Sequence, residues 1–249
     1  MNRLMKAEWY RVTRSSGLMR WLLFICVIDV AFPFLMNWEI YKMDLTRNLW
    51  ADQEYMMMFV PFFLSVFSAT VVGISYMNKT AYYEVMAGNK ISHILLSKVM
   101  VNATLITVAV SAFLGIYWTI IGVCNGKGEI KQLSIRFVLL FLLFYHICAT
   151  GILIVTSVRQ IMGTVLAFIR FAVVEMVILV ILQIFGDSFS TETVEKIVDW
   201  FTMMKFTKIL SYEYEITDHL IFAVIAGMLL EAGIWYMISY MGMRKRIYK

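Results

Sequence analysis

The sequence predicts an all-α integral membrane protein with six transmembrane helices. Of its 249 residues, 61% are hydrophobic and 16% are charged, whereas a soluble domain is about 45–50% apolar and about 25% charged. The chain has only two prolines, so long helices can run almost uninterrupted. Each crossing needs about 20 residues. Six crossings with short loops therefore use up residues 1–249 as a single domain and leave no room for a separate catalytic domain.

The first 20 residues are basic and amphipathic. On a helical wheel the apolar residues share one side, namely Leu4, Met5, Trp9 and Val12. The basic residues Arg3, Lys6 and Arg14 lie opposite, and Glu8 is the exception to the pattern. We expect an interfacial helix that is held by its apolar face and by attraction to anionic lipid.

Six apolar runs follow, and they predict spans at about 21–38, 56–76, 99–123, 137–158, 162–185 and 220–241. Lys and Arg are denser in the segments on the side of the two termini, so the positive-inside rule predicts that both termini are cytosolic. The loop at 124–136 argues the other way, because it carries Lys127, Lys131 and Arg136. The three cysteines are scattered over apolar runs and predict no disulfide framework and no metal site.

Titratable residues inside the predicted spans are candidates for a translocation path, since a charge there costs about 2.5–3.5 kcal/mol on insertion scales. They are Asp29, His146, Arg170, Glu175 and Glu231. Arg170 and Glu175 are separated by about 140° on an α-helix and should not pair directly, whereas Arg170 and Glu231 could pair between neighbouring spans. Asp29, Arg170, Glu175 and Glu231 either line a path for a cationic or amphipathic peptide or hold spans together. For His146 we expect a helix–helix hydrogen bond.

The segment 78–98 separates the second and third spans and is too amphipathic for a simple linker. Tyr82, Tyr83 and Met86 mix with Lys79 and Glu84, as in a short helix at the membrane surface. Gly88 can adopt the left-handed conformation that ends such a helix. Asn89 or Ser92 can then cap the next helix, which leads into the third span.

The segment 186–219 is the longest loop and contains a further helical pattern. Thr191 and Glu195 open a stretch in which Val194, Ile197, Val198, Phe201 and Met204 recur at helical spacing. We expect short helices on the outer side of the membrane between the fifth and sixth spans. They dip into the outer leaflet or roof a cavity, and an aromatic interfacial belt is an alternative that is compatible with either.

This layout resembles that of the ABC-2 family of ATP-binding-cassette permeases over essentially the whole chain. The local likeness lies before the third span, in Glu84, Gly88, Lys90, Ile94 and Lys98. The small size and the absence of a fused ATPase look most like the permeases of bacteriocin, lantibiotic and bacitracin immunity and of amphipathic-peptide export. Permeases that export sodium or drugs are close alternatives.

The resemblance implies a permease subunit in the bacterial cytoplasmic membrane. ATP and Mg²⁺ would be bound by a separate ATPase, and the chain itself has no GxxxxGK[ST] phosphate loop and no cofactor. The coupling surface toward that ATPase would comprise Lys79, Tyr82, Tyr83, Glu84, Met86 and Gly88. Further partners would be a second permease, identical or related, the lipid membrane and a peptide cargo, with no nucleic acid.

Two other classes of function compete with transport. An intramembrane enzyme would need motifs such as HExxH or Gly-x-Ser-x-Gly, and the sequence contains neither. We therefore expect no enzymatic activity in this chain. A membrane scaffold or assembly factor without a transport path is the second alternative, and the amphipathic segment 78–98 with the charges inside the spans argues against it.

Overall fold

The computed structural model describes residues 1–14, 60–77, 80–125, 130–158, 160–185, 191–210 and 215–247, together with the single positions 20, 23 and 27. The predicted first span, with Asp29, and Lys79 lie outside the described residues. Within them every regular element is helical and no strand occurs. The elements are α1 (Asn2–Arg14), α4 (Val60–Met77), α5 (Thr80–Met86), α6 (Ile91–Asn125), α7 (Ile130–Ser157), α8 (Gln160–Phe168), the π-helix η2 (Ile169–Val174), α9 (Glu175–Phe185), α10 (Thr191–Val198), α11 (Thr202–Leu210) and α12 (Asp218–Ile247).

Three described helical stretches are long and apolar enough to cross a membrane. They are Ile91–Ala112, Ser134–Ser157 and Asp218–Arg246. They overlap the third, fourth and sixth spans predicted at 99–123, 137–158 and 220–241, although the first of them begins well before the predicted span. Shorter apolar stretches, Phe63–Ile74 and Met162–Phe171, lie in the predicted second and fifth spans. The helical, apolar character of the chain is therefore confirmed. The count of six spans and their orientation stay predictions.

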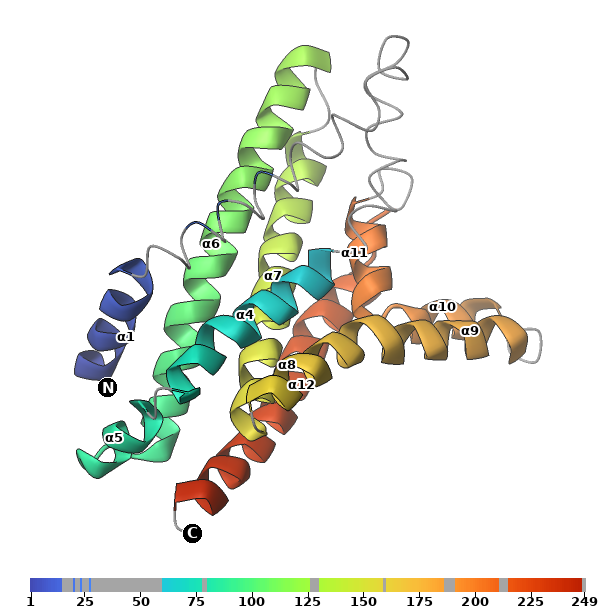
Figure 1. Cartoon of the computed structure of the whole chain (residues 1–249). Coiled ribbons are helices and arrows are strands. Elements are labelled where there is room, and N and C mark those ends of the chain that lie inside the picture. Colours follow the sequence, from blue (N-terminus) through green and yellow to red (C-terminus); the bar gives the residue numbers. More distant parts are fainter. Residues whose placement is uncertain are drawn as a thin grey trace.

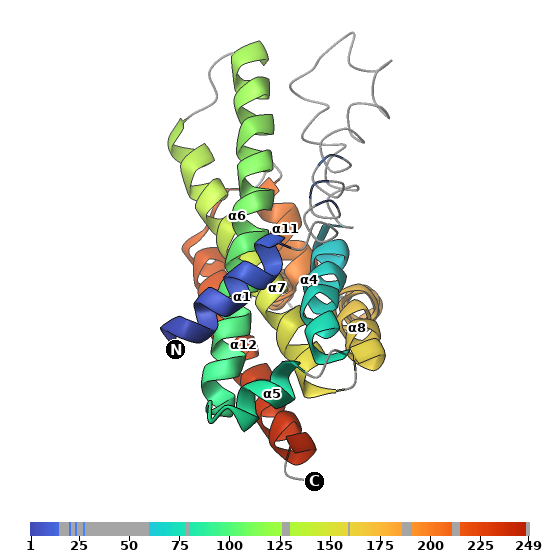
Figure 2. The same cartoon turned by 60° about the vertical axis from the view of Figure 1, so that its left-hand side comes forward.

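Helix α7 is the centre of the bundle, and α4, α6, α8 and α12 pack around it (Figures 1 and 2). Its side chains are almost all buried between Leu139 and Thr156. Leu140, Leu143, Phe144 and Ile147 form the middle of the main core, to which Phe206 of α11 also belongs. A helix that is apolar all round and buried by neighbours on all sides has the pattern of a central span.

The contact between α4 and α7 depends on a glycine. A Cβ atom at Gly151 would lie 2.6 Å from the carbonyl oxygen of Ser65 and 2.7 Å from Oγ of Ser68. Small residues at such points let helix backbones approach closely in membranes. Because the nearest atom is backbone, Gly151→Leu should force the helices apart and cost about 1–3 kcal/mol of stability. Thermal unfolding in detergent would measure this, with Gly233→Leu as the control, since no atom lies within 4 Å of a Cβ there.

A smaller apolar cluster joins four helices at one end of the bundle. Ala81 of α5 packs with Ile91, Ile94 and Leu95 of α6 and with Met243 of α12. The partly buried residues Leu4, Val85 and Tyr236 add contacts from α1, α5 and α12. In Figures 1 and 2, α5 and the end of α12 lie at this same end of the molecule. We call this four-helix arrangement the platform.

The end of α12 is fastened to the end of α7 by polar contacts. Arg246 donates to the carbonyl oxygens of Thr156 and, at 3.0 Å, of Val158, and Ser239 donates to that of Leu153 at 2.5 Å. A cationic side chain near the last carbonyls of a helix compensates their unpaired charge. This fastening fixes one wall of the platform.

The turn after α5 adopts the predicted glycine conformation. Gly88 has a φ of +85°, the left-handed value that glycine tolerates best. Its N–H donates to the carbonyl of Val85 at 2.8 Å. The prediction that Asn89 or Ser92 caps the next helix is wrong, because α6 begins at Ile91. Asn89 instead donates through Nδ2 to the carbonyl oxygen of Glu84 at 2.9 Å and so caps the end of α5.

Two short helices, α10 and α11, fill the segment between α9 and α12. Arg136 at the start of α7 is buried and donates to the carbonyl oxygens of Lys208 and Ile209, at 3.3 and 2.7 Å. A guanidinium at the last carbonyls of a helix satisfies them and complements the helix dipole. Arg136, which opposed the predicted orientation, therefore has a structural role at this end of the molecule.

Candidate functional site

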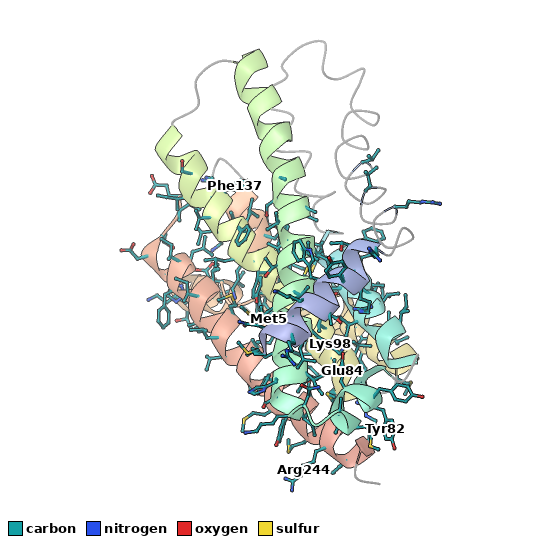
Figure 3. All side chains as sticks on the ribbon, turned by 90° about the vertical axis from the view of Figure 1, so that its left-hand side faces the viewer. Met5, Tyr82, Glu84, Lys98, Phe137 and Arg244 are labelled. Atoms are coloured by element: carbon teal, nitrogen blue, oxygen red, sulfur yellow. The ribbon has the colours of Figure 1, made fainter. Side chains whose placement is uncertain are left out.

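Helix α5 presents three large side chains to the outside of the platform. Tyr82, Tyr83 and Met86 are 46, 63 and 69% exposed, whereas Ala81 and Val85 on the other side pack into the platform. In Figure 3, Tyr82 points away from the bundle at the end where Arg244 also lies. A helix of seven residues is too short to be stable alone, so the platform holds its orientation. We call Tyr82, Tyr83 and Met86 the α5 face.

Glu84, predicted to belong to the coupling surface, turns inward. Its Oε2 lies 3.5 Å from Nζ of Lys98, a side chain of α6 that is only 1% exposed. Figure 3 shows the two residues side by side, next to α1. Gly88 ends α5, as described, and its position is exposed. Of the coupling residues the structure describes, α5 thus presents two tyrosines and a methionine outward and uses its glutamate as an internal anchor.

The same lysine binds α1. Nζ of Lys98 lies 3.5 Å from Oε2 of Glu8, which is buried although its helix is mostly exposed. Nδ2 of Asn102 donates to Oε1 of Glu8 at 2.8 Å, and Arg11 donates to both Glu8 oxygens. Glu8, the exception on the helical wheel of the leader, is therefore the residue that fixes α1 to α6. Lys98 lies between two carboxylates and connects α5 with α1.

The two carboxylates respond differently to this shared lysine. Burial raises the pKa of Glu84, and the attraction of Lys98 does not fully offset that effect. Burial also acts on Glu8, but the hydrogen bond from Arg11 and the charge of Lys98 prevail, so the pKa of Glu8 lies below its ordinary value of 4.5. Glu8 is thus the better-stabilised anion of the pair.

These opposite shifts predict opposite effects of the two glutamine substitutions. The stabilisation from Glu8 is present above its unfolded pKa and is lost as the pH falls through its folded pKa. Glu8→Gln should therefore lower the melting temperature at pH 7, and this effect should decrease as the pH falls below 4.5. Glu84 favours its protonated form in the fold, and its stabilisation is lost as the pH rises, so Glu84→Gln should leave the melting temperature at pH 7 unchanged or raise it. Thermal unfolding at pH 7 and below pH 4.5 checks this, and equal losses for both variants would contradict it.

A second group of charges lies among the apolar helices. Arg170 of η2 binds Glu231 of α12 with two hydrogen bonds, from Nε at 2.8 Å and from Nη2 at 3.0 Å. This confirms the predicted pairing of Arg170 with Glu231. Nη1 of Arg170 also donates to Oε1 of Glu175 at 2.8 Å. The prediction that Arg170 and Glu175 do not pair is therefore wrong.

The reason for the second contact is the π-helix. Between Ile169 and Val174 the chain winds more widely than an α-helix, and in a π-helix the hydrogen bond joins residues i and i+5. Residues five apart then lie one above the other, which brings Glu175 beneath Arg170. The separation of about 140° holds only for 3.6 residues per turn. No feature of the local sequence predicted the π-helical turn.

Other helices add to this ion-pair cluster, which we define as Arg170, Glu175, Glu231, His146 and Lys205. Oε2 of Glu175 accepts a hydrogen bond of 2.8 Å from the backbone N–H of Met203, at the start of α11. Nε2 of His146 lies 3.2 Å from Oε2 of Glu231, an ion pair when the imidazole is protonated. His146 reaches α12, although neither of its ring nitrogens has an aligned hydrogen bond. Lys205 is buried beside the two described carboxylates; it forms no ion pair with them within 4 Å, and their attraction acts on it from a longer distance.

The cluster balances its own charge. Arg170 and Lys205 are two cations, Glu175 and Glu231 are two anions, and the four side chains come from η2, α9, α11 and α12. Paired charges of this kind can persist in a membrane interior where a lone charge cannot. Three predicted path residues therefore meet at one place, and Asp29 falls outside the described residues.

Sequence reasoning missed Lys98, Asn102 and Lys205 as partners of the selected residues. Asn102 and Glu8 are 94 positions apart, and nothing in either local pattern points to the other. A signal did exist for Glu8, since a lone acid interrupted the basic and apolar faces of an amphipathic helix. No protein-family model matches the chain, and no curated protein is significantly similar to it.

Proposed function

We propose that the chain is the membrane subunit of an ATP-driven exporter and that α5 docks onto a separate ATPase. The α5 face is the observation that carries this proposal. Two tyrosines and a methionine at 46–69% exposure form a compact apolar patch, at the end of the bundle where α12 brings the exposed basic residues Arg244 and Lys245. Aromatic residues and methionine are enriched where proteins bind other proteins.

The support beneath α5 suits a helix that has to transmit force. Apolar contacts join α5 to α6 and α12, and the pair of Glu84 with Lys98 adds a charged contact near its end. A push on α5 would therefore act on α6 directly. The ATPase groove that fits this surface is apolar with an acidic rim, because the exposed cations Lys90, Arg244 and Lys245 come from the turn after α5 and from the end of α12.

The proposed cargo is an amphipathic peptide, expelled from the membrane or the cytosol, as the resemblance implies. Ions or small drugs are the alternative cargo of the same transporter.

A non-transporting scaffold is the second candidate function. One observation favours it: the ion-pair cluster is neutral in itself and joins four helical elements, as a purely structural device would.

Co-purification tests the proposal. The full chain is extracted from its native membranes in mild detergent and analysed for a bound ATPase, whose turnover is then measured with and without amphipathic peptide. An ATPase whose turnover rises with peptide would support the exporter. An ATPase stimulated only by ions or drugs would change the cargo. Absence of any bound ATPase in every detergent would overturn the proposal in favour of the scaffold.

A further inference from the structure

We propose that Glu231 and Glu175 form a binding site for guanidinium groups of basic cargo, and that Arg170 occupies this site from within the chain until cargo displaces it. The proposal rests on the export of amphipathic peptides and adds the chemical group of the cargo that is recognised. It also makes Arg170 an autoinhibitory residue. The structure as described would then be the state without cargo.

The geometry of the site is specific for a guanidinium. Glu231 takes two parallel hydrogen bonds from Nε and Nη2 of Arg170, and Glu175 takes a third from Nη1. All three nitrogens of one planar group are thus bound by two carboxylates from different helices. This fork geometry is how carboxylates distinguish arginine from the point charge of lysine.

The exposure of the residues indicates where a ligand enters. The side chains of Arg170 and Glu231 are 24 and 18% exposed, whereas those of Glu175 and His146 are 1 and 2% exposed. Arg170 and Glu231 therefore lie at the accessible edge, and the other two lie behind them. An arriving peptide would meet the Arg170–Glu231 pair first.

Exchange of one guanidinium for another avoids the main cost of opening such a site. Removal of a single partner from a buried ion pair leaves an uncompensated charge. A cargo arginine that replaces Arg170 keeps both carboxylates paired, and Arg170, whose side chain is 24% exposed, must then reach water at the accessible edge. The cluster thus favours cationic guests over neutral ones.

The π-helix provides a means to withdraw Arg170. If residues 169–174 rewind to α-helical geometry, Arg170 and Glu175 separate by about 140° around the axis. Such π segments are rare and frequently occur at functional sites. A change of register in six residues would therefore break the contact of Arg170 with Glu175 and leave Glu231 as its remaining partner.

Binding to the isolated full chain in detergent tests this inference. The probe is a fluorescently labelled amphipathic helical peptide that carries arginines, and its matched control has citrulline, which is uncharged and nearly isosteric, at the same positions. In the variant Arg170→Gln the internal guest is absent and both carboxylates of the site, Glu175 and Glu231, remain. We expect it to bind the arginine peptide about 10-fold more tightly than the unaltered protein does. Glu231→Gln should lower the affinity to that of the citrulline peptide.

A more conservative second variant tests the same expectation in case the first variant misfolds. Arg170→Lys keeps the positive charge but loses the fork, and it should also bind the arginine peptide more tightly. Equal affinities for both peptides in every variant would overturn the inference. Peptide binding is measured without an ATPase, so the two proposals can fail separately. If the affinity changes as expected in these variants but no ATPase partner is found, only the exporter proposal is overturned. If an ATPase partner is found but the affinity for the arginine peptide does not depend on Arg170 and Glu231, only the proposed binding site is overturned.

Discussion

Replacement of Tyr83 and Met86 by alanine should detach the ATPase and abolish export without affecting membrane insertion. Both side chains are more than 60% exposed and make no contribution to the platform core. A large side chain buried at the centre of an interface contributes about 2 kcal/mol or more, equivalent to about 30-fold in the dissociation constant. Even with incomplete additivity, the double substitution should weaken binding by about 100-fold. Titration of the purified ATPase against the reconstituted variant measures this.

Helix α12 offers a matched control for this experiment. Met237 and Tyr240 are the same two residue types, also exposed, but they lie on α12, outside the α5 face. Met237→Ala with Tyr240→Ala should leave ATPase binding unchanged. An equal loss in both double variants would indicate a general effect of lost apolar surface. Unchanged binding in the α5 variant would remove α5 as the docking element.

Lys98→Met should cause the largest loss of stability of any single change near the platform. Lys98 is buried and is the partner of both Glu8 and Glu84. Breaking a buried ion pair costs about 3–5 kcal/mol, and we expect the lower end of that range, because Glu84 loses its partner while Glu8 keeps Arg11 and Asn102. We expect α1 and α5 to loosen together, with faster proteolysis in the turn around Gly88. Thermal unfolding and limited proteolysis in detergent would detect both effects.

The controls use the same residue type. Lys90→Met removes an exposed lysine from the same turn and should change stability by no more than about 0.5 kcal/mol. Glu84→Gln added to Lys98→Met should restore part of the loss, since Lys98 is the ion-pair partner of Glu84, whereas Glu8 keeps its pair with Arg11. A Lys98→Met protein as stable as Lys90→Met would show that the buried network does not hold the two helices.

The sequence predictions that the structure confirms were based on the pattern of apolar residues, on the backbone conformation of glycine and on the cost of a charge in a membrane. Long apolar runs predicted the helices, and the left-handed Gly88 followed from its place after an amphipathic segment. The pairing of Arg170 with Glu231 followed from the cost of an unpaired charge in a membrane. Each of these inferences depends on local sequence or on a single strong penalty, which are the kinds of information that one chain contains.

The features that were missed depend on information of another kind. The contact of Arg170 with Glu175 requires a wider helical turn, which tertiary packing selects and residue spacing does not reveal. The bridge from Glu8 through Lys98 to Glu84 joins three helices, and sequence gives no register between them. The number of spans, the orientation and the partner ATPase stay predictions, since they depend on the membrane and on other chains.

The uninterrupted length of α6 has a mechanical consequence. Its 35 residues correspond to about 52 Å at 1.5 Å per residue, well beyond the hydrocarbon thickness of about 30 Å. The helix contains no proline and begins three residues after Gly88, so it follows directly on the turn at the end of α5. A tilt of about 5° at the α5 end would displace the other end by about 4–5 Å. A rigid-body tilt of one helix could therefore carry a signal across the whole bilayer without any intervening hinge.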